Sequence, residues 1–302
     1  MKGLRLLCVP NFSEGRRPKV LQAIRDAIAS HRVEFHGEWP DADHNRTVFA
    51  YSGLARHVAK AVIDSGMVAR EMIDLNKHEG AHPRIGALDV MPFVLFDPAR
   101  EEEAVIASHR IAKRYAKDVG TPVYLYEQSA KPGRIADLPT LRKGEFEGWV
   151  GQTLNGLRKP DYGGSRLHPT AGATIMGVRR PLAAFNVNLT ADDLQCAKEV
   201  AKQVRELRDT EPELTGVRAI GVWLPQRGHA QISLNLSRLD ATNVTSVFHR
   251  ICELVWRQGG TVTGSELIGV LFDTDAAKAL GASLDAGIAP QQIIETQAAA
   301  SP

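Results

Sequence analysis

Residues 182–193 read Leu-Ala-Ala-Phe-Asn-Val-Asn-Leu-Thr-Ala-Asp-Asp and join an apolar strand to the start of a helix. The apolar first part is typical of a short β-strand. Thr190 is the expected N-cap of a helix that continues to Leu207. Asp192 and Asp193 would stand in its first turn, where the helix dipole stabilises negative charge. This stretch therefore predicts a strand that leads directly into a helix.

The rest of the second half extends this start into a complete unit. Its patterns predict two strands, a helix and a last strand over residues 217–224, 230–236, 242–257 and 260–270. The two adjacent strands flank a turn of Gln226, Arg227 and Gly228. The resulting order, strand-helix-strand-strand-helix-strand, is that of the ferredoxin-like split unit.

The first half has the same order of elements. Its patterns predict a strand, a helix, two strands, a helix and a strand over residues 4–9, 18–30, 33–38, 47–52, 54–75 and 88–96. An insertion from about residue 98 to 180 then holds a helix, a strand and a long stretch rich in glycine and proline. The two halves share element order and no clear residue-level identity.

This repeat predicts an α+β protein of two ferredoxin-like subdomains, residues 1–180 and 181–302. Each antiparallel sheet would be covered by its own helices on one face and would leave the other face to find a partner. We therefore expect the two sheets to face each other across a groove, where small-molecule sites tend to form.

The composition fits a globular enzyme or binding protein. The formal net charge of +2 argues against a surface dominated by nucleic-acid binding. The three cysteines form no CxxC pair, which fits a reducing cytoplasm. No apolar run approaches the length of a membrane span, and the N-terminus lacks the cleavage site of a signal peptide. We expect a cytoplasmic protein that binds small molecules and neither nucleic acid nor membranes.

Residues 78–82, His-Glu-Gly-Ala-His, match the H-E-x-x-H pattern of zinc peptidases. That pattern needs a helix, in which the two histidines share one face. Gly80 costs about 1 kcal/mol relative to alanine in a helix, and Pro83 pushes His82 out of the helical region. We therefore expect a loop, no metal, and no ligand shared by His78 and His82. A histidine on a loop that leads into an apolar strand suits a general base at a cleft.

Segments along most of the chain match one family in a single order. They are residues 8–15 (Cys-Val-Pro-Asn-Phe-Ser-Glu-Gly), 45–48 (Asn-Arg-Thr-Val), 82–90 (His-Pro-Arg-Ile-Gly-Ala-Leu-Asp-Val), 122–126, 161–172, 184–189 and 264–267. From about residue 5 to about 270, the chain resembles the glutamate formiminotransferases, including that half of formiminotransferase-cyclodeaminase. The cyclodeaminase half has no counterpart in these residues.

The resemblance implies a transferase of histidine and one-carbon metabolism. Such enzymes move the formimino group of N-formimino-L-glutamate to N5 of the co-substrate tetrahydrofolate, and most are homodimers. Their fold is two ferredoxin-like subdomains around a folate tunnel. Carried over by motif, the catalytic histidine is His82. The folate-contacting loop is Gly163, Gly164, Ser165, Arg166, Leu167, His168, Pro169, Thr170, Ala171 and Gly172, and its glycines lead us to expect mobility without folate.

The chemistry of the reaction fits His82. N5 of the reduced pterin carries a proton that must leave when it attacks the amidine carbon. A neutral imidazole titrates near working pH and can accept that proton. The alternative is a histidine that only bonds a backbone group in a turn.

Other residues are candidates for substrate binding, each with a structural alternative. Arg84 suits a substrate carboxylate, or an ion pair with Asp89 or Asp74. Asn11 and Ser13, with Glu14, follow a strand end where ligands bind, although Ser13 and Glu14 also suit helix capping.

The remaining candidates are charged. Asp41 and Asp43 suit a cationic amidine or the pterin amino group, or simply a turn. Glu266 lies in the last matching segment. Arg166 and His168 would add positive charge near the glutamate tail of folate, with a solvated loop histidine as the alternative for His168.

The chain departs from the family where Glu79 and Ala81 replace a lysine and a glutamate. If that glutamate orients the imidazole or binds the amidine, the enzyme would be slower or would use another donor. Three other functions stay open from the residues. They are a related enzyme acting on 5-formyltetrahydrofolate, a non-catalytic folate-binding protein and a zinc peptidase.

Overall fold

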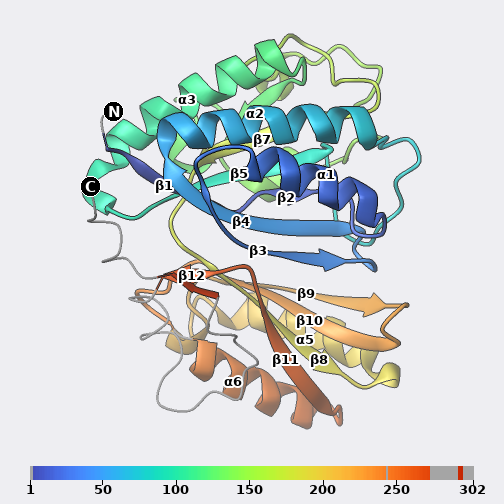
Figure 1. Cartoon of the computed structure of the whole chain (residues 1–302). Helices are drawn as coiled ribbons and strands as arrows, with labels where there is room; N and C mark the ends of the chain where they lie inside the picture. The colour runs from blue at the N-terminus through green and yellow to red at the C-terminus, as the bar shows by residue number, and fades with distance from the viewer. Residues whose placement is uncertain (1–2, 243, 273–291, 295–302) are drawn as a thin grey trace. The chain divides into compact units, whose positions relative to one another are not determined.

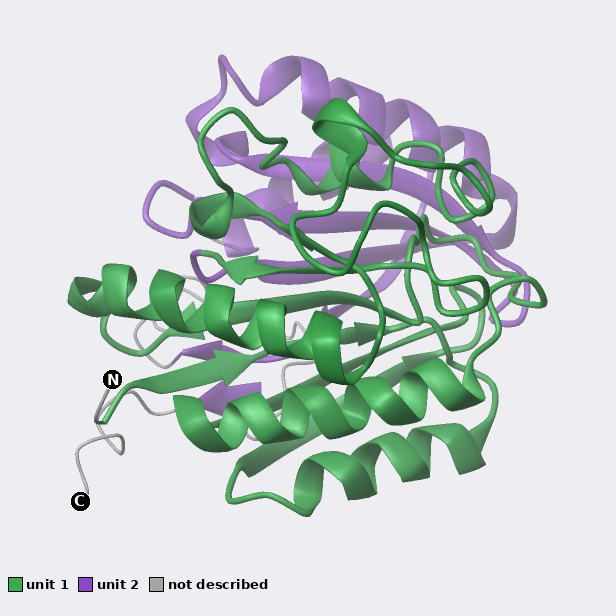
Figure 2. Ribbon diagram, turned by 90° about the horizontal axis from the view of Figure 1, so that it is seen from above, with its two compact units in different colours: residues 1–179 green, residues 180–302 purple. Residues whose placement is uncertain are grey.

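The computed structural model describes residues 3–242, 244–272 and 292–294 (Figure 1). The chain divides into two compact units, Met1–Arg179 and Arg180–Pro302 (Figure 2). Each unit has its own sheet and its own buried apolar cluster. Both are mixed α+β structures. None of the helices in the described ranges is both long and apolar enough to span a bilayer.

The sheet of the first unit is seven-stranded and is built around an interrupted strand. Its two parts, β1 (Arg5–Cys8) and β2 (Asn11–Phe12), both pair antiparallel with β4 (Arg46–Leu54) and β5 (Leu88–Leu95). At the edge, β3 (Glu34–Asp41) pairs antiparallel with β4. Every residue of β5 is buried, as expected for a central strand. The strands predicted over 33–38, 47–52 and 88–96 are confirmed with small changes at their ends.

Two further strands extend this sheet beyond β5. β7 (Thr174–Val178) pairs parallel with β5, and β6 (Val123–Leu125) pairs parallel with β7. The sequence patterns predicted β6 but missed β7. All five residues of β7 are buried. A strand covered on both faces shows no polar alternation, so its sequence does not stand out from the Gly- and Pro-rich stretch before it.

Three helices cover one face of this sheet: α1 (Pro18–Ala29), α2 (Ala55–Met72) and α3 (Glu101–Asp118) (Figure 1). α1 packs on α2, and α2 packs on α3. The predicted face of α1 is confirmed, because Val20, Leu21, Ile24 and Ile28 are all buried. α2 ends at Met72, earlier than expected, since Ile73 already has an extended backbone.

Short elements complete the first unit and lie in the connections. They are α4 (Leu138–Arg142) and the 3-10 turns Pro98–Arg100, Glu127–Ser129 and Gly156–Arg158. α4 starts at Asp137, whose side chain accepts a hydrogen bond from the backbone N–H of Thr140 at 3.0 Å. This cap fixes the helix that carries Arg142, a residue of the site described below.

The second unit has a four-stranded antiparallel sheet in the order β11-β8-β10-β9. The strands are β8 (Ala183–Leu189), β9 (Val217–Leu224), β10 (His229–Leu236) and β11 (Val262–Ile268). Its helices, α5 (Leu194–Leu207) and α6 (Val244–Arg257), pack together on one face (Figure 1). The predicted element order is thus observed. Short pieces are the 3-10 turns Ala191–Asp193 and Pro212–Leu214 and the strands β12 (Leu271–Phe272) and β13 (Ile293–Ile294).

The start of α5 differs from the prediction in one detail. A 3-10 turn, Ala191–Asp193, precedes the α-helix. The hydroxyl of Thr190 does not accept a backbone N–H, as a capping side chain would, and instead donates to Asp193 Oδ2 at 2.6 Å. The same carboxylate oxygen accepts the backbone N–H of Thr261 at 3.0 Å. Asp193, and not Thr190, therefore ties the start of the helix to the neighbouring strand.

Candidate active site

The segment that joins α2 to β5 carries both histidines and contains no helix, so the predicted loop is confirmed. His78 Nε2 lies 2.8 Å from the carbonyl oxygen of Asn45, to which it donates. Its Nδ1 accepts the Nε–H of Arg84 at 3.0 Å. Burial is the main cause that lowers the pKa of His78. His78 therefore has both ring nitrogens committed to holding the loop.

His82 is bonded in a different way. Its Nδ1 lies 2.8 Å from the carbonyl oxygen of Pro83, and its Nε2 lies 2.6 Å from Nη1 of Arg46. A carbonyl can only accept and a guanidinium can only donate. His82 is therefore neutral, with the proton on Nδ1 and a lone pair on Nε2. Burial is the main cause that lowers its pKa well below the usual value, and Arg46, Arg142 and His44 add to the effect.

The two histidines share no partner in this arrangement. Within the described ranges, no group of three or more His, Cys, Asp or Glu side chains is placed to hold a metal ion. Residues 78–82 thus match the zinc-peptidase pattern in sequence but not in structure, because no helix places the two histidine rings on one face.

The turn between β3 and β4 supplies the next layer around His82. The rings of His44 and His82 meet edge to face, with centroids 6.0 Å apart. Asp41 Oδ1 accepts the backbone N–H of His44 at 2.8 Å, and Asp41 Oδ2 lies 3.0 Å from ring Nδ1 without the geometry of a hydrogen bond. The backbone of Asp43 accepts the N–H of Ala81 at 3.4 Å. Asp41 thus has the turn role foreseen as the alternative to ligand binding, and both aspartates lie close to the His82 loop.

Arg46 stands at the start of β4 and is partly exposed. Across the part of the chain that the structure describes, no carboxylate lies within 4.0 Å of its guanidinium. Its one side-chain hydrogen bond to a described residue goes to His82. Burial, and then the nearby charge of Arg142, lower the pKa of Arg46 to about 10. Sequence reasoning gave Arg46 no role, although the residue lies in a segment that matched the family.

Asp89 anchors the end of the loop where β5 begins. Its side chain is 2% exposed. Oδ1 accepts the backbone N–H groups of Ile85 at 2.7 Å and Gly86 at 3.2 Å, and Oδ2 forms an ion pair with Arg142. The carboxylate therefore fixes the backbone that follows His82 and balances one of the two arginines beside the imidazole.

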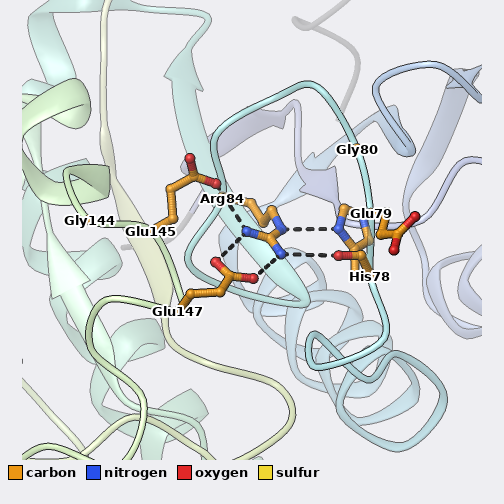
Figure 3. A pocket seen from close by; sticks show the side chains of 7 residues that line it. All are labelled: His78, Glu79, Gly80, Arg84, Gly144, Glu145 and Glu147. Carbon is orange, nitrogen blue, oxygen red and sulfur yellow. Dashed lines mark hydrogen bonds and ion pairs between the residues drawn. The ribbon is translucent and has the colours of Figure 1, made fainter.

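Arg84 lies in a pocket of about 500 Å³ that is lined by His78, Glu79, Gly80, Arg84, Gly144, Glu145 and Glu147 (Figure 3). Its guanidinium donates to His78 Nδ1, to the carbonyl oxygen of His78 and to both Glu145 and Glu147. The ion pair with Asp89 or Asp74, given as the alternative to substrate binding, is not formed, because Glu145 and Glu147 are the carboxylate partners. All five N–H groups are used, which favours a structural role over binding of a substrate carboxylate.

The two positions that depart from the family lie on the same loop. Glu79 is exposed and lines the Arg84 pocket, where its carboxylate points away from the guanidinium (Figure 3). Ala81 is exposed and bonds Asp43 through its backbone. The orientation of the His82 ring is set here by the carbonyl oxygen of Pro83.

The Gly163–Gly172 loop lies against the segment that follows His82. The backbone N–H of Ala87 bonds Ala171 O at 2.9 Å, and Gly172 pairs with Gly86 in an antiparallel bridge. The N–H of Leu75 bonds Thr170 O at 2.8 Å. The structure therefore brings the predicted folate loop and the His82 loop together. Ser165 O in the first half of the loop accepts the N–H of Leu154 at 2.7 Å. Mobility of the Gly163–Gly172 loop without folate stays a prediction.

Side chains of this loop correct one expectation. His168 Nδ1 accepts the backbone N–H groups of Thr170 at 3.3 Å and Ala171 at 3.1 Å, and burial lowers its pKa. His168 therefore contributes a lone pair to a turn and not a positive charge. Arg166 is exposed, and its Nε donates to the hydroxyl of Thr153 at 3.1 Å.

Ser13, which directly follows β2, holds the same segment. Ser13 is buried; its hydroxyl donates to Gly86 O at 2.7 Å and its N–H to Ala87 O at 2.9 Å. Glu14 accepts the backbone N–H groups of Arg16 and Arg17 just before α1, but the helix has no side-chain capping bond at its N-cap, Arg17. Asn11 bonds the carbonyl oxygen of Val9 at 3.2 Å. Ser13 thus supports the loop that carries His82.

Glu266 belongs to the second unit and lies on β11. Its Oε1 accepts hydrogen bonds from Arg227 at 2.9 Å, Gln231 at 3.0 Å and Asn186 at 3.3 Å. These partners come from β8, β10 and the turn before β10. The carboxylate is therefore the centre of a polar network in the second sheet.

A pair of glycines provides a stability test of the folate loop. Gly172 has φ +68°, and a Cβ built there would lie 1.9 Å from Ile85 O. Gly133 has a similar φ of +74° but nothing within 4 Å of such a Cβ. Gly133→Ala should lower the free energy of unfolding by about 1 kcal/mol, and Gly172→Ala by several times that amount. Urea unfolding of both variants measures this, and equal losses would contradict the close approach.

Comparison with known proteins gives a consistent result over both units. Residues 5–179 match the family model described as the N-terminal subdomain of the formiminotransferase domain, and residues 184–279 match the formiminotransferase domain. A glutamate formimidoyltransferase of Streptococcus pyogenes serotype M1 is 38% identical over 264 residues, covering 87% of each chain. One from Thermoplasma acidophilum is 34% identical, also covering 87% of each chain.

A longer relative matches over part of its length. The formimidoyltransferase-cyclodeaminase of Sus scrofa is 35% identical over 276 residues, which are 87% of this chain and 49% of the relative. Together the matches define the chain as a transferase. It belongs to the formiminotransferase family.

Proposed function

We propose that this chain is a glutamate formimidoyltransferase that moves the formimino group of N-formimino-L-glutamate to N5 of tetrahydrofolate, with His82 as the general base. The named relatives of matching length support the activity. The observation that supports the role of His82 is its protonation state, because a neutral ring with the lone pair on Nε2 can accept a proton. The carbonyl oxygen of Pro83 accepts a hydrogen bond from Nδ1 of His82 and so keeps the proton on that nitrogen.

The proton balance of the reaction assigns His82 two tasks. Tetrahydrofolate supplies the nucleophile, N5, which bonds to the amidine carbon. His82 Nε2 accepts the proton that N5 loses. The imidazolium then donates this proton to the glutamate nitrogen, whose bond to the former amidine carbon breaks. Glutamate leaves as the neutral amine and takes up its last proton from water, and His82 ends in its starting state.

The loop from Gly163 to Gly172 is proposed to hold the folate. Gly163 and Gly164 are exposed and have φ of +89° and +98°. Such backbone leaves no side chain between the loop and a flat ligand. Arg166 is the exposed cation of the loop and suits an anionic tail. Substrate contacts from Asn11, Ser13, Asp41, Asp43, Arg84 and Glu266 have weaker support, since most of these side chains already serve structural bonds.

The proposal extends to the larger arrangement. The element order of each unit supports two ferredoxin-like formiminotransferase subdomains, residues 1–180 and 181–302, with sheets facing across a folate groove. We also expect the protein to form a homodimer and to be located in the cytoplasm.

The test of the function is a direct assay. Purified protein should convert formiminoglutamate and tetrahydrofolate to 5-formiminotetrahydrofolate and glutamate, each followed by chromatography. Turnover of 5-formyltetrahydrofolate in its place would favour the related folate enzyme. Folate binding without turnover of either compound would favour a binding protein.

The pH dependence tests the base. A general base works unprotonated, and the pKa of His82 is lowered well below the ordinary 6.5 by burial and then by Arg46. The neutral form therefore persists to lower pH, and kcat/KM should be lost only as pH falls through that lowered pKa. A profile measured from pH 5 to 9 should be flat above pH 6.5. An acid limb centred at or above 6.5 would contradict the assignment.

A further inference from the structure

We propose that Arg46 binds the α-carboxylate of the formimino donor and that this contact uncovers the base on His82. The inference rests on the proposed function and adds a residue that recognises the donor. It makes Arg46 part of the substrate site and a switch on the neighbouring imidazole.

The first support is the missing counter-ion of Arg46. Its neighbour Arg142 forms an ion pair with Asp89, and Arg84 is held by Glu145 and Glu147. In the described ranges, no carboxylate comes within 4.0 Å of the Arg46 guanidinium. A guanidinium in a confined setting without an anion is costly, and a ligand carboxylate removes that cost. Arg46 therefore has the electrostatics of an anion-binding residue.

The second support is the hydrogen bond that Arg46 makes. Its Nη1–H points at Nε2 of His82 at 2.6 Å and occupies the lone pair that the base must use. The other nitrogen cannot replace it, because Nδ1 donates to Pro83 O. The base is thus capped until Arg46 turns away. A carboxylate offers the guanidinium a charge-assisted, bidentate partner that outcompetes a neutral imidazole.

The chemistry of the substrates identifies which carboxylate fits. In formiminoglutamate the α-carboxylate is separated from the reacting amidine carbon only by the amide-type nitrogen and the α-carbon. An arginine that contacts the base on His82 can therefore also reach this α-carboxylate. The carboxylates of the folate tail lie beyond the aminobenzoyl group and are far from N5. Arg46 is therefore better placed to bind the α-carboxylate of the donor than a carboxylate of the folate tail.

Donor binding would also change the strength of the base. The charged or titratable groups that face His82 are Arg46, Arg142 and His44, and those that act on Arg46 include Asp41 and Asp89. Arg142 is already balanced by Asp89. A carboxylate on Arg46 would neutralise the remaining cation, raise the pKa of His82 and make it a better proton acceptor.

The experiment compares two donors in four proteins. The donors are formiminoglutamate and its analogue without the α-carboxylate, N-formimino-4-aminobutyrate. The proteins are wild type, Arg46→Gln, Arg46→Lys and the surface control Arg114→Gln, whose arginine pairs with Asp118 on α3. Wild type and control should prefer the full donor by roughly 10- to 100-fold in kcat/KM, and Arg46→Gln should lose that preference. Arg46→Lys should restore part of it.

Three controls separate the outcomes. Thermal unfolding and tetrahydrofolate binding should match wild type in Arg46→Gln, and the acid limb of kcat/KM should move to higher pH. A weakened binding of tetrahydrofolate with an unchanged KM for the donor would overturn the proposal and assign Arg46 to the folate tail. An equal preference for the full donor in wild type and Arg46→Gln would also overturn it.

Direct binding distinguishes failure of this inference from failure of the proposed function. Calorimetry with the product L-glutamate needs no turnover. Binding by wild type that Arg46→Gln loses by roughly 10-fold or more supports the carboxylate site even if formiminoglutamate is not the donor. Equal binding in both proteins, or no binding in wild type at millimolar glutamate, counts against it.

Discussion

Replacing His82 with alanine should lower kcat by roughly 10²- to 10⁴-fold, the range expected for a positioned general base. The side chain is half-buried on a loop, and its hydrogen bonds join Pro83 and Arg46 without crossing the apolar core. Its loss should therefore leave folding and folate binding close to wild type. Steady-state kinetics with formiminoglutamate and tetrahydrofolate, together with a thermal unfolding curve, measure both parts of the expectation.

His78→Ala is the matched control on the same loop. Its ring bonds Asn45 O and Arg84 Nε and so links the loop to the turn before β4. We expect a loss of stability of about 1–3 kcal/mol and a much smaller change in kcat than for His82→Ala. Equal losses of turnover, or full activity of His82→Ala, would show that the base has been assigned wrongly. An unfolded His82→Ala protein would favour the turn role for His82.

Asp89→Ala should have the largest effect on stability, about 3–5 kcal/mol in the free energy of unfolding. The change would leave Arg142 without its carboxylate and the N–H groups of Ile85 and Gly86 without an acceptor. A buried unpaired charge is the main cost. The urea unfolding midpoint measures it, and turnover should fall as well because the same backbone positions His82.

The surface pair Arg114–Asp118 provides the comparison for Asp89. Its atoms are 2.9 Å apart, but both side chains are partly exposed on α3. Asp118→Ala should cost less than about 0.5 kcal/mol, since solvent screens exposed pairs. If Asp89→Ala were as mild as Asp118→Ala, the buried pair would not be what fixes this end of the loop.

Local patterns in the sequence were enough for most helices and strands. The apolar spacing of Val20, Leu21, Ile24 and Ile28 predicted the buried face of α1, and Gly80 with Pro83 predicted the loop. β7 could not be predicted in this way, because a strand buried on both faces has no alternation of polar and apolar residues. The sequence predicts a longer α2 than the structure has. The apolar pattern continues to Leu75, whereas the backbone is already extended at Ile73.

The pairing of charged residues was the part that sequence could not supply. Arg84 pairs with Glu145 and Glu147, which are about sixty positions away along the chain. No local spacing relates these residues, so nearer aspartates were expected instead. The role of Arg46 could not be predicted for the same reason. It depends on the lack of a nearby carboxylate among the described residues and on a hydrogen bond to His82, 36 positions away along the chain.

The backbone pairing between residues 85–87 and residues 171–173 has a mechanical consequence. Ala87 bonds Ala171, Gly86 pairs with Gly172, and Ala173 bonds Ile85. A displacement of the anchored half of the folate loop would therefore pull on the strand entrance that follows His82. The loop that carries His82 and the second half of the Gly163–Gly172 loop are thus tied to each other by backbone hydrogen bonds. The backbone around His82 is therefore held in place by main-chain bonds, whereas Arg46 contacts His82 through its side chain alone.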